Sequence, residues 1–167
     1  DVAKRSGILA GVLVLCLFAI LLCATSFWLD RNELPDGFQN EYEHSYTLTE
    51  VYFRIRDVSW ADAQGALWSG YYPPLEHAVA SIGLSLAGRS HRVAVLSLSV
   101  FLLLLLVSAH TLGRFLRDPS TGLFAATLLA SYPSVFGNAR RYEPNIALAG
   151  LVAAALAWLV LRKGLPR

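Results

Sequence analysis

Residues 7–29 read GILAGVLVLCLFAILLCATSFWL, a stretch of 23 residues without a charge. A helix of this length is about 34 Å long, enough to cross a bilayer core of about 30 Å. Further apolar runs cover residues 93–112, 120–136 and 146–161. The sequence therefore predicts an all-α integral membrane protein with about four transmembrane helices.

Charge is divided unevenly between one polar segment and the rest of the chain. Residues 30–72 hold eight acids and three bases, whereas the other 124 residues hold four acids and eleven bases. Lys and Arg favour the cytoplasmic ends of membrane spans. We therefore predict a cytoplasmic N-terminus beside Lys4 and Arg5, followed by a large extracytoplasmic loop.

Composition agrees with this class, because 55% of the residues are apolar and only 16% are charged. The net charge of +2 is too small to argue for nucleic acid, and the bases lie where lipid headgroups meet the spans. We expect membrane lipids as partners, no nucleic acid, and a place in the bacterial inner (plasma) membrane. Because the chain begins with Asp1 and contains no Met, we expect residues 1–167 to be part of a longer protein.

Residues 75–88 are an apolar run of only 14 residues, which suits a helix at the membrane surface better than a span. If this run crossed the membrane, Arg114 and Arg117 would lie outside. If it lies flat, they lie inside with the other bases, as the positive-inside rule favours. We therefore predict one extracytoplasmic loop over 30–91 that contains juxtamembrane helices, with the segment 137–144 returning to the same face.

The loop alternates acids with aromatic residues, which favour the headgroup level of a bilayer. Its pattern predicts one or two short amphipathic helices over residues 42–58. Gly and Pro over residues 65–74 predict an irregular connection.

Carboxylates follow the first apolar run closely. Asp36 lies in the turn-forming sequence Pro35-Asp36-Gly37, and Glu41 comes soon after it. Turns at a membrane surface can present a carboxylate to a cleft, and catalytic groups concentrate on loops held by a rigid scaffold. Asp36 is therefore a candidate catalytic group. The alternative is that these acids only keep a surface loop soluble.

A second polar group lies between the last two apolar runs. Arg140 and Arg141 are followed by Glu143 and Asn145. Ionisable residues this close to hydrocarbon are costly unless they are paired or functional. The planar donor fork of Arg suits phosphate, so the pair could hold the phosphate of a lipid-linked substrate. The alternative is interfacial snorkelling, with Glu143 either neutralising one arginine or serving as a second active-site carboxylate.

Histidines invite a metal interpretation, but they form no cluster with ligand spacing. They are His44, His77, His91 and His110. The sequence predicts no metal ligands and fixes no cofactor, and it leaves a divalent metal open.

Together these features resemble a known family. A single span, a loop with an early acid, Tyr72-Pro73-Pro74-Leu75, a Leu-rich span and an Arg-plus-acid segment follow one another. This order resembles the N-terminal part of membrane glycosyltransferases of the GT-C fold. It is most similar to the superfamily of dolichyl-phosphate-mannose protein mannosyltransferases and aminoarabinose lipid A transferases. The resemblance covers nearly all of the chain, but only the first part of a typical member.

The resemblance implies an inverting, mannosyltransferase-like transfer of a glycosyl group from a polyprenyl-phosphate sugar to a lipid, glycan or protein acceptor. The reaction would take place at the extracytoplasmic face of the cell envelope membrane. Asp36 is then the general base, with Glu41 and Glu143 as further candidate catalytic acids. Arg140 and Arg141 are then the groups that bind the donor phosphate.

Two positions depart from the family pattern. Tyr72 stands where the family's Lys-Pro-Pro-Leu motif has Lys, while Pro73 and Pro74 match it. The family has an acid five residues after its arginine, and Asn145 stands there. Either Glu143 supplies the second carboxylate from a shifted position, or Asp36, the acid of the first loop, works alone. We expect Tyr72, Pro73, Pro74 and Asn145 to belong to the substrate-binding site.

A different class remains as the alternative, namely a non-catalytic polytopic membrane protein or transporter fragment whose outer loop binds a partner. A transporter should carry charged or broken helices near the middle of the membrane. In this chain the charged residues lie at the ends of the apolar runs.

Overall fold

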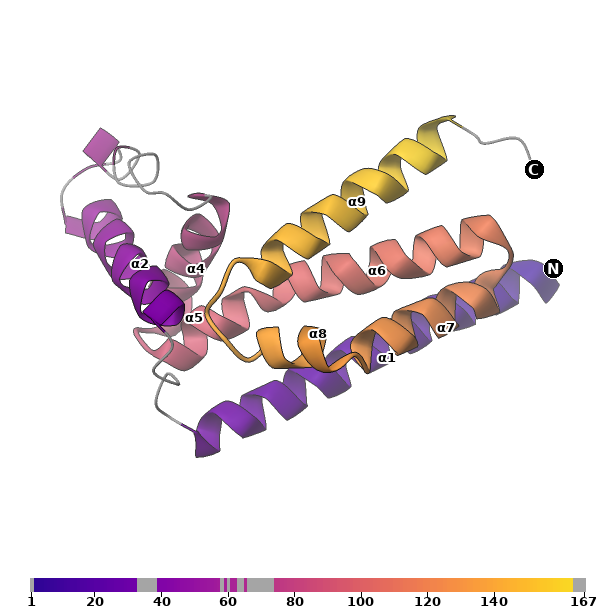
Figure 1. The fold of residues 1–167 in the computed structure, drawn as a ribbon, viewed down its shortest axis with the longest axis horizontal. Helices are drawn as coiled ribbons and strands as arrows, with labels where there is room; N and C mark the ends of the chain where they lie inside the picture. The colour runs from indigo at the N-terminus through magenta and orange to yellow at the C-terminus, as the bar shows by residue number, and fades with distance from the viewer. Residues whose placement is uncertain are drawn as a thin grey trace. The chain divides into compact units, whose positions relative to one another are not determined.

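The computed structural model describes residues 2–32, 39–57, 59, 61–62, 65 and 74–163, and this part of the chain is helical, without strands. Figure 1 shows the helices in chain order. Their bounds are α1 Val2–Arg31, α2 Gln39–Asp57, α4 Pro74–Ala87, α5 His91–Ser97, α6 Ser99–Leu116, α7 Pro119–Ala130, α8 Pro133–Asn138 and α9 Asn145–Lys163.

Three helical stretches in the described part are long and apolar enough to cross a membrane: Ser6–Arg31, His91–Leu116 and Asn145–Arg162. They contain the runs predicted at 7–29, 93–112 and 146–161. Large apolar side chains are exposed along α1 and α9. Since a soluble protein rarely leaves so much apolar surface uncovered, these helices are compatible with a membrane protein.

The run predicted as a single span at residues 120–136 instead forms two helices, α7 and α8. The break falls just before Pro133, which has no amide hydrogen to continue a helix. Helix α7 has 12 residues and is therefore about 18 Å long, shorter than a bilayer core of about 30 Å.

The chain divides into two compact units, each described by itself. The first contains Asp1–Ala24, Val100–Gly137 and Ile146–Arg167. Within it, α6 and α7 approach closely at glycines: a Cβ added at Gly113 would lie 2.8 Å from the Cα of Gly122, and one at Gly122 would lie 2.4 Å from the carbonyl oxygen of His110. Small residues let membrane helices pack in this way.

A bulky residue at Gly122 is therefore expected to separate α6 from α7. We predict that Gly122→Leu destabilises the protein by about 1–3 kcal/mol through overpacking against the His110 carbonyl. Gly11→Leu is the matched control, because a Cβ added at Gly11 meets nothing within 4 Å. Thermal unfolding in detergent, followed by circular dichroism, measures both variants. Equal melting temperatures for the two would contradict this packing.

The second unit contains Thr25–Ser99 and Asn138–Asn145. In it α2 contacts α4, and α4 contacts α5. Helices α4 and α5 are joined through Gly88, whose φ of +96° suits glycine, and Gly83 of α4 leaves no room for a Cβ beside Ser97. The run at 75–88 forms the helix α4, and the one or two short helices predicted over 42–58 form the single helix α2.

Candidate active site

Tyr142 and His77 form the buried centre of a polar cluster in the second unit. Tyr142 is fully buried and His77 is 1% exposed. The Tyr142 hydroxyl lies 2.9 Å from Nδ1 of His77. This contact joins the segment between α8 and α9 to the first turn of α4.

Glu76 extends the cluster on the other side of the imidazole. Its Oε1 lies 3.5 Å from Nε2 of His77, and its side chain is almost fully buried. A proton on Nε2 of His77 faces this carboxylate and leaves Nδ1 to accept from the Tyr142 hydroxyl. Burial, with the Glu76 charge as a smaller cause, holds the pKa of Tyr142 well above its ordinary value of 10.0. Tyr142 is therefore a neutral hydrogen-bonding group at physiological pH.

The carboxylate of Glu143 accepts a hydrogen bond from the side-chain amide of Asn145. Asn145 donates from Nδ2 to Oε2 of Glu143 at 2.8 Å and to Oδ1 of Asn138 at 3.0 Å. Glu143 is 9% exposed, and Nη1 of Arg141 lies 4.0 Å from its Oε1. A carboxylate at position 145 would repel Glu143, whereas the amide orients it. The amide of Asn145 thus accompanies a carboxylate two residues earlier in the chain.

Arg140 lies against the last turns of α1. Its guanidinium carbon is 5.3 Å from the centre of the Trp28 ring, close enough for a cation–π contact. Desolvation lowers the pKa of Arg140 below its ordinary value. Because the ordinary pKa of arginine is very high, the guanidinium still carries its charge, so one partly desolvated cation lies here.

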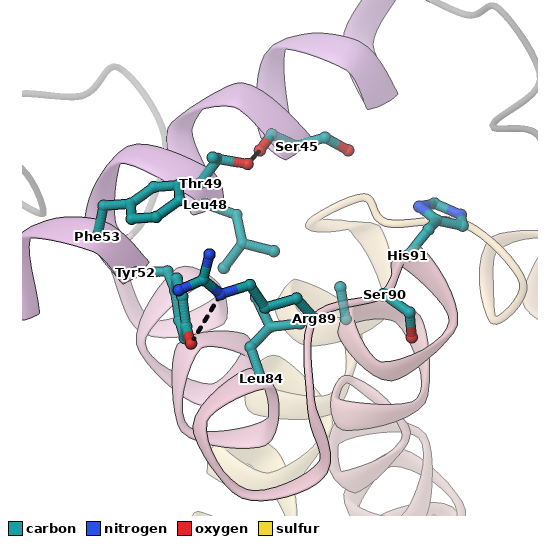
Figure 2. A pocket seen from close by; sticks show the side chains of 10 residues that line it. Ser45, Leu48, Thr49, Tyr52, Phe53, Leu84, Arg89, Ser90 and His91 are labelled. Atoms are coloured by element: carbon teal, nitrogen blue, oxygen red, sulfur yellow. Dashed lines mark hydrogen bonds between the residues drawn. The ribbon is translucent and has the colours of Figure 1, made fainter. Parts of the chain in front are cut away.

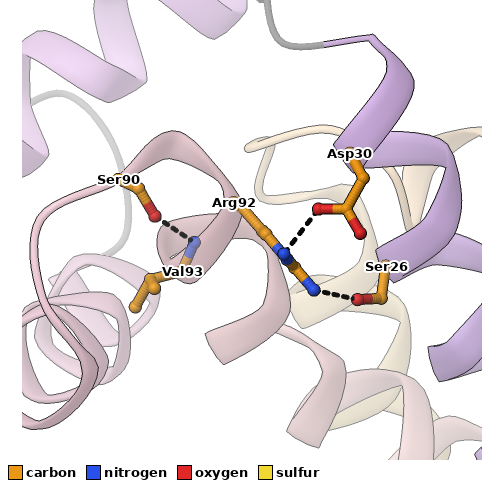
Figure 3. Close-up of polar contacts among 5 residues, drawn as sticks. All are labelled: Ser26, Asp30, Ser90, Arg92 and Val93. Atoms are coloured by element: carbon orange, nitrogen blue, oxygen red, sulfur yellow. Dashed lines mark hydrogen bonds and ion pairs between the residues drawn. The ribbon is translucent and has the colours of Figure 1, made fainter.

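The same unit joins the end of α1 to the start of α5, as Figure 3 shows. Arg92 pairs with Asp30 at 2.5 Å and donates to the Ser26 hydroxyl at 2.6 Å. The Ser90 hydroxyl accepts from the amide of Val93 and caps α5. These bonds fix the point at which the chain leaves α1.

The predicted site residues fall into two groups. Those of the 138–145 segment, Arg140, Arg141, Glu143 and Asn145, lie together in the second unit. The others are placed only in part: Pro74 is the first residue of α4, Glu41 lies in α2 with its side chain outside the described part, and Asp36, Tyr72 and Pro73 lie outside the described residues.

Sequence reasoning missed Glu76 and Tyr142, and it considered His77 only as a metal ligand. A signal was available, since Glu76 and His77 directly follow Pro-Pro-Leu at the start of an apolar helix, where ionisable residues call for a partner or a function. The described part of the chain holds no group of three His, Cys, Asp or Glu side chains placed to bind a metal ion.

Comparisons with protein-family models, with curated proteins and with solved structures each returned no match.

The buried hydroxyl of Tyr142 leads to a prediction about alkaline stability. Because its pKa is raised in the folded protein, the unfolded chain releases this proton first, and unfolding becomes more favourable as the pH rises above about 10. Tyr142→Phe removes this contribution. Its melting temperature should therefore fall less than that of the native protein between about pH 9 and about pH 11.

Tyr132→Phe is the control for this experiment, since Tyr132 is 61% exposed. We expect it to follow the native protein over the same pH range. At neutral pH, Tyr142→Phe should be less stable by about 1 kcal/mol, because the hydrogen bond to His77 is lost. An alkaline fall equal to that of the native protein would contradict a buried, neutral Tyr142.

Proposed function

We propose that this protein transfers a glycosyl group from a polyprenyl-phosphate sugar to an acceptor hydroxyl at the extracytoplasmic face of a membrane. The acceptor belongs to a lipid, a glycan or a protein. The reaction is an inverting transfer of the GT-C type, and the proposal follows the resemblance of the sequence to that group.

One structural observation supports the proposal above the others. The segment with Arg140, Arg141 and Glu143 lies in the same compact unit as the last turns of α1, with Arg140 against Trp28. Asp36 follows the end of α1 by five residues. Five residues of extended chain reach at most about 18 Å. The chain therefore keeps the candidate base within about 18 Å of the end of α1, in the unit that also holds the candidate phosphate-binding residues.

In the proposed reaction Asp36 accepts the proton of the acceptor hydroxyl as the oxygen forms its bond to the anomeric carbon. The bond between that carbon and the phosphate oxygen breaks on the opposite face, and its electron pair leaves with the lipid phosphate. Arg140 and Arg141 stabilise the charge that builds on the departing phosphate. Glu143, oriented by Asn145, positions Arg141 or serves as the second carboxylate.

The proposed reaction also requires a particular topology in the membrane. In this topology α7 and α8 together form the fourth crossing, which comes in the chain between the apolar helices His91–Leu116 and Asn145–Arg162. The N-terminus is cytoplasmic, as Lys4 and Arg5 favour, and α4 lies along the outer surface. The membrane is then the bacterial inner (plasma) membrane.

A transfer assay tests the function directly. Membranes that contain the full protein are incubated with a labelled polyprenyl-phosphate sugar and extracted, and the label is followed into lipid, glycan and protein fractions. We expect transfer that membranes without the protein lack, with inversion at the anomeric carbon. If several different sugar-loaded polyprenyl phosphates were tried as donors and none was consumed, the proposal would be contradicted.

A further inference from the structure

A cavity of about 330 Å³ lies within the second unit, between α2, α4 and the start of α5. Figure 2 shows the ten residues that line it. Its walls are mainly apolar, with Leu48 and Phe53 from α2, Leu84 from α4 and Ala94 from α5. Small-molecule sites in proteins have volumes of about 300–1,000 Å³, so the cavity is large enough for the head and first carbons of a ligand.

Arg89 supplies the cavity with a fixed positive charge. Its Nε donates to the Tyr52 hydroxyl at 3.2 Å, and its guanidinium carbon lies 5.0 Å from the centre of the Tyr52 ring and 4.7 Å from that of Phe53. Figure 2 shows the guanidinium reaching toward α2 within the cavity. The hydrogen bond to Tyr52 uses only Nε, so the two terminal nitrogens keep their donors for a ligand.

The other groups that line the cavity also favour an anionic ligand. None of the ten described lining residues is Asp or Glu, although residues 30–72 hold eight acids. Ser45 and Thr49 add hydroxyl groups on the α2 side. A positive, partly apolar cavity suits an anion that also carries an apolar part. Arg binds phosphate with its planar fork of donors, and the anionic amphiphiles of membranes carry phosphate.

We propose that this cavity binds a phosphate-bearing amphiphile, with its phosphate on Arg89 and its first carbons against Leu48, Phe53 and Leu84. The site is distinct from the Arg140 and Arg141 segment. The proposal does not rest on glycosyl transfer, because its test measures binding and not turnover.

Titration calorimetry of the full protein in maltoside micelles tests the site, with dodecyl phosphate as the probe. We expect saturable binding that Arg89→Gln weakens about tenfold, because a charged hydrogen bond is lost. Arg54→Gln is the matched control. Arg54 lies on α2, which forms one wall of the cavity, but it pairs with Glu50 and does not line the cavity. Equal affinity in the native protein and in Arg89→Gln would overturn the proposal.

A second variant keeps the test sound if Arg89→Gln does not fold. Thr49→Phe fills the cavity and should abolish binding, while its cost to the fold is small because the Thr49 hydroxyl bonds only within its own helix. Dodecyl phosphate that still binds to folded Thr49→Phe would contradict the assignment.

Two further ligands test which kind of molecule carries the bound phosphate. Inorganic phosphate alone should bind at least about tenfold more weakly than dodecyl phosphate, because it lacks the apolar part; equal affinity would overturn the amphiphile proposal. Competition by phosphatidylglycerol in nanodiscs would support a bilayer lipid as the source. Binding of dodecyl phosphate without such competition would support a free phosphate amphiphile.

Discussion

Asp36→Asn should lower glycosyl transfer by at least about 100-fold, because the amide cannot take the acceptor proton. The amide has nearly the shape of the carboxylate, so membrane insertion and folding should not change. The measurement is the initial rate of label transfer from a polyprenyl-phosphate sugar in membranes, normalised to the amount of protein.

The control for this variant lies in the same acidic segment. Asp62 accepts from the Ser59 hydroxyl, and its backbone N–H donates back to that hydroxyl, so its carboxylate has a local role. Asp62→Asn should transfer at nearly the native rate. If Asp36→Asn matched it, another group would have to be the base, and Glu143 would be the next to test.

Arg140→Ala is expected to reduce transfer by about 100-fold, since a preorganised cation at the departing phosphate is lost. The loss should appear mainly in the dependence on donor concentration, with the dependence on acceptor little changed. Arg140→Lys should recover only part of the rate, because an ammonium group keeps the charge but not the planar fork or the stacking on Trp28.

Arg117→Ala is the control for removing one positive charge. Its side chain is 81% exposed and faces Asp118 within the first unit. Transfer should stay near the native rate. A donor dependence in Arg140→Ala equal to that of Arg117→Ala would refute the phosphate assignment and leave Arg140 as a packing partner of Trp28.

The long apolar helices could be predicted from the sequence because their signal is local. The uncharged stretch at 7–29 and the run at 93–112 need no partner to identify them, since length and hydropathy suffice. The break between α7 and α8 could also have been predicted from the sequence, because Pro133 has no amide hydrogen to continue a helix. Helix α4 was predicted with nearly its observed bounds for the same reason.

The candidate site was predicted only where its residues are neighbours in the chain. Arg140, Arg141, Glu143 and Asn145 stand within one short segment, and their residue types alone suggested phosphate and carboxylate chemistry. The contact between His77 and Tyr142 joins positions 65 residues apart. No pattern in a single sequence specifies such a pairing.

By itself, the sequence determined the helical class, the long apolar helices and the acidic segment after the first of them, because hydropathy and charge act residue by residue. The tertiary structure decided which polar groups share a buried space. Glu76 and His77 lie with Tyr142, Asn145 holds Glu143, and Arg89 faces the cavity beside Tyr52. The reason is physical: a polar group removed from water must find a partner, and which partner it finds depends on how distant helices pack.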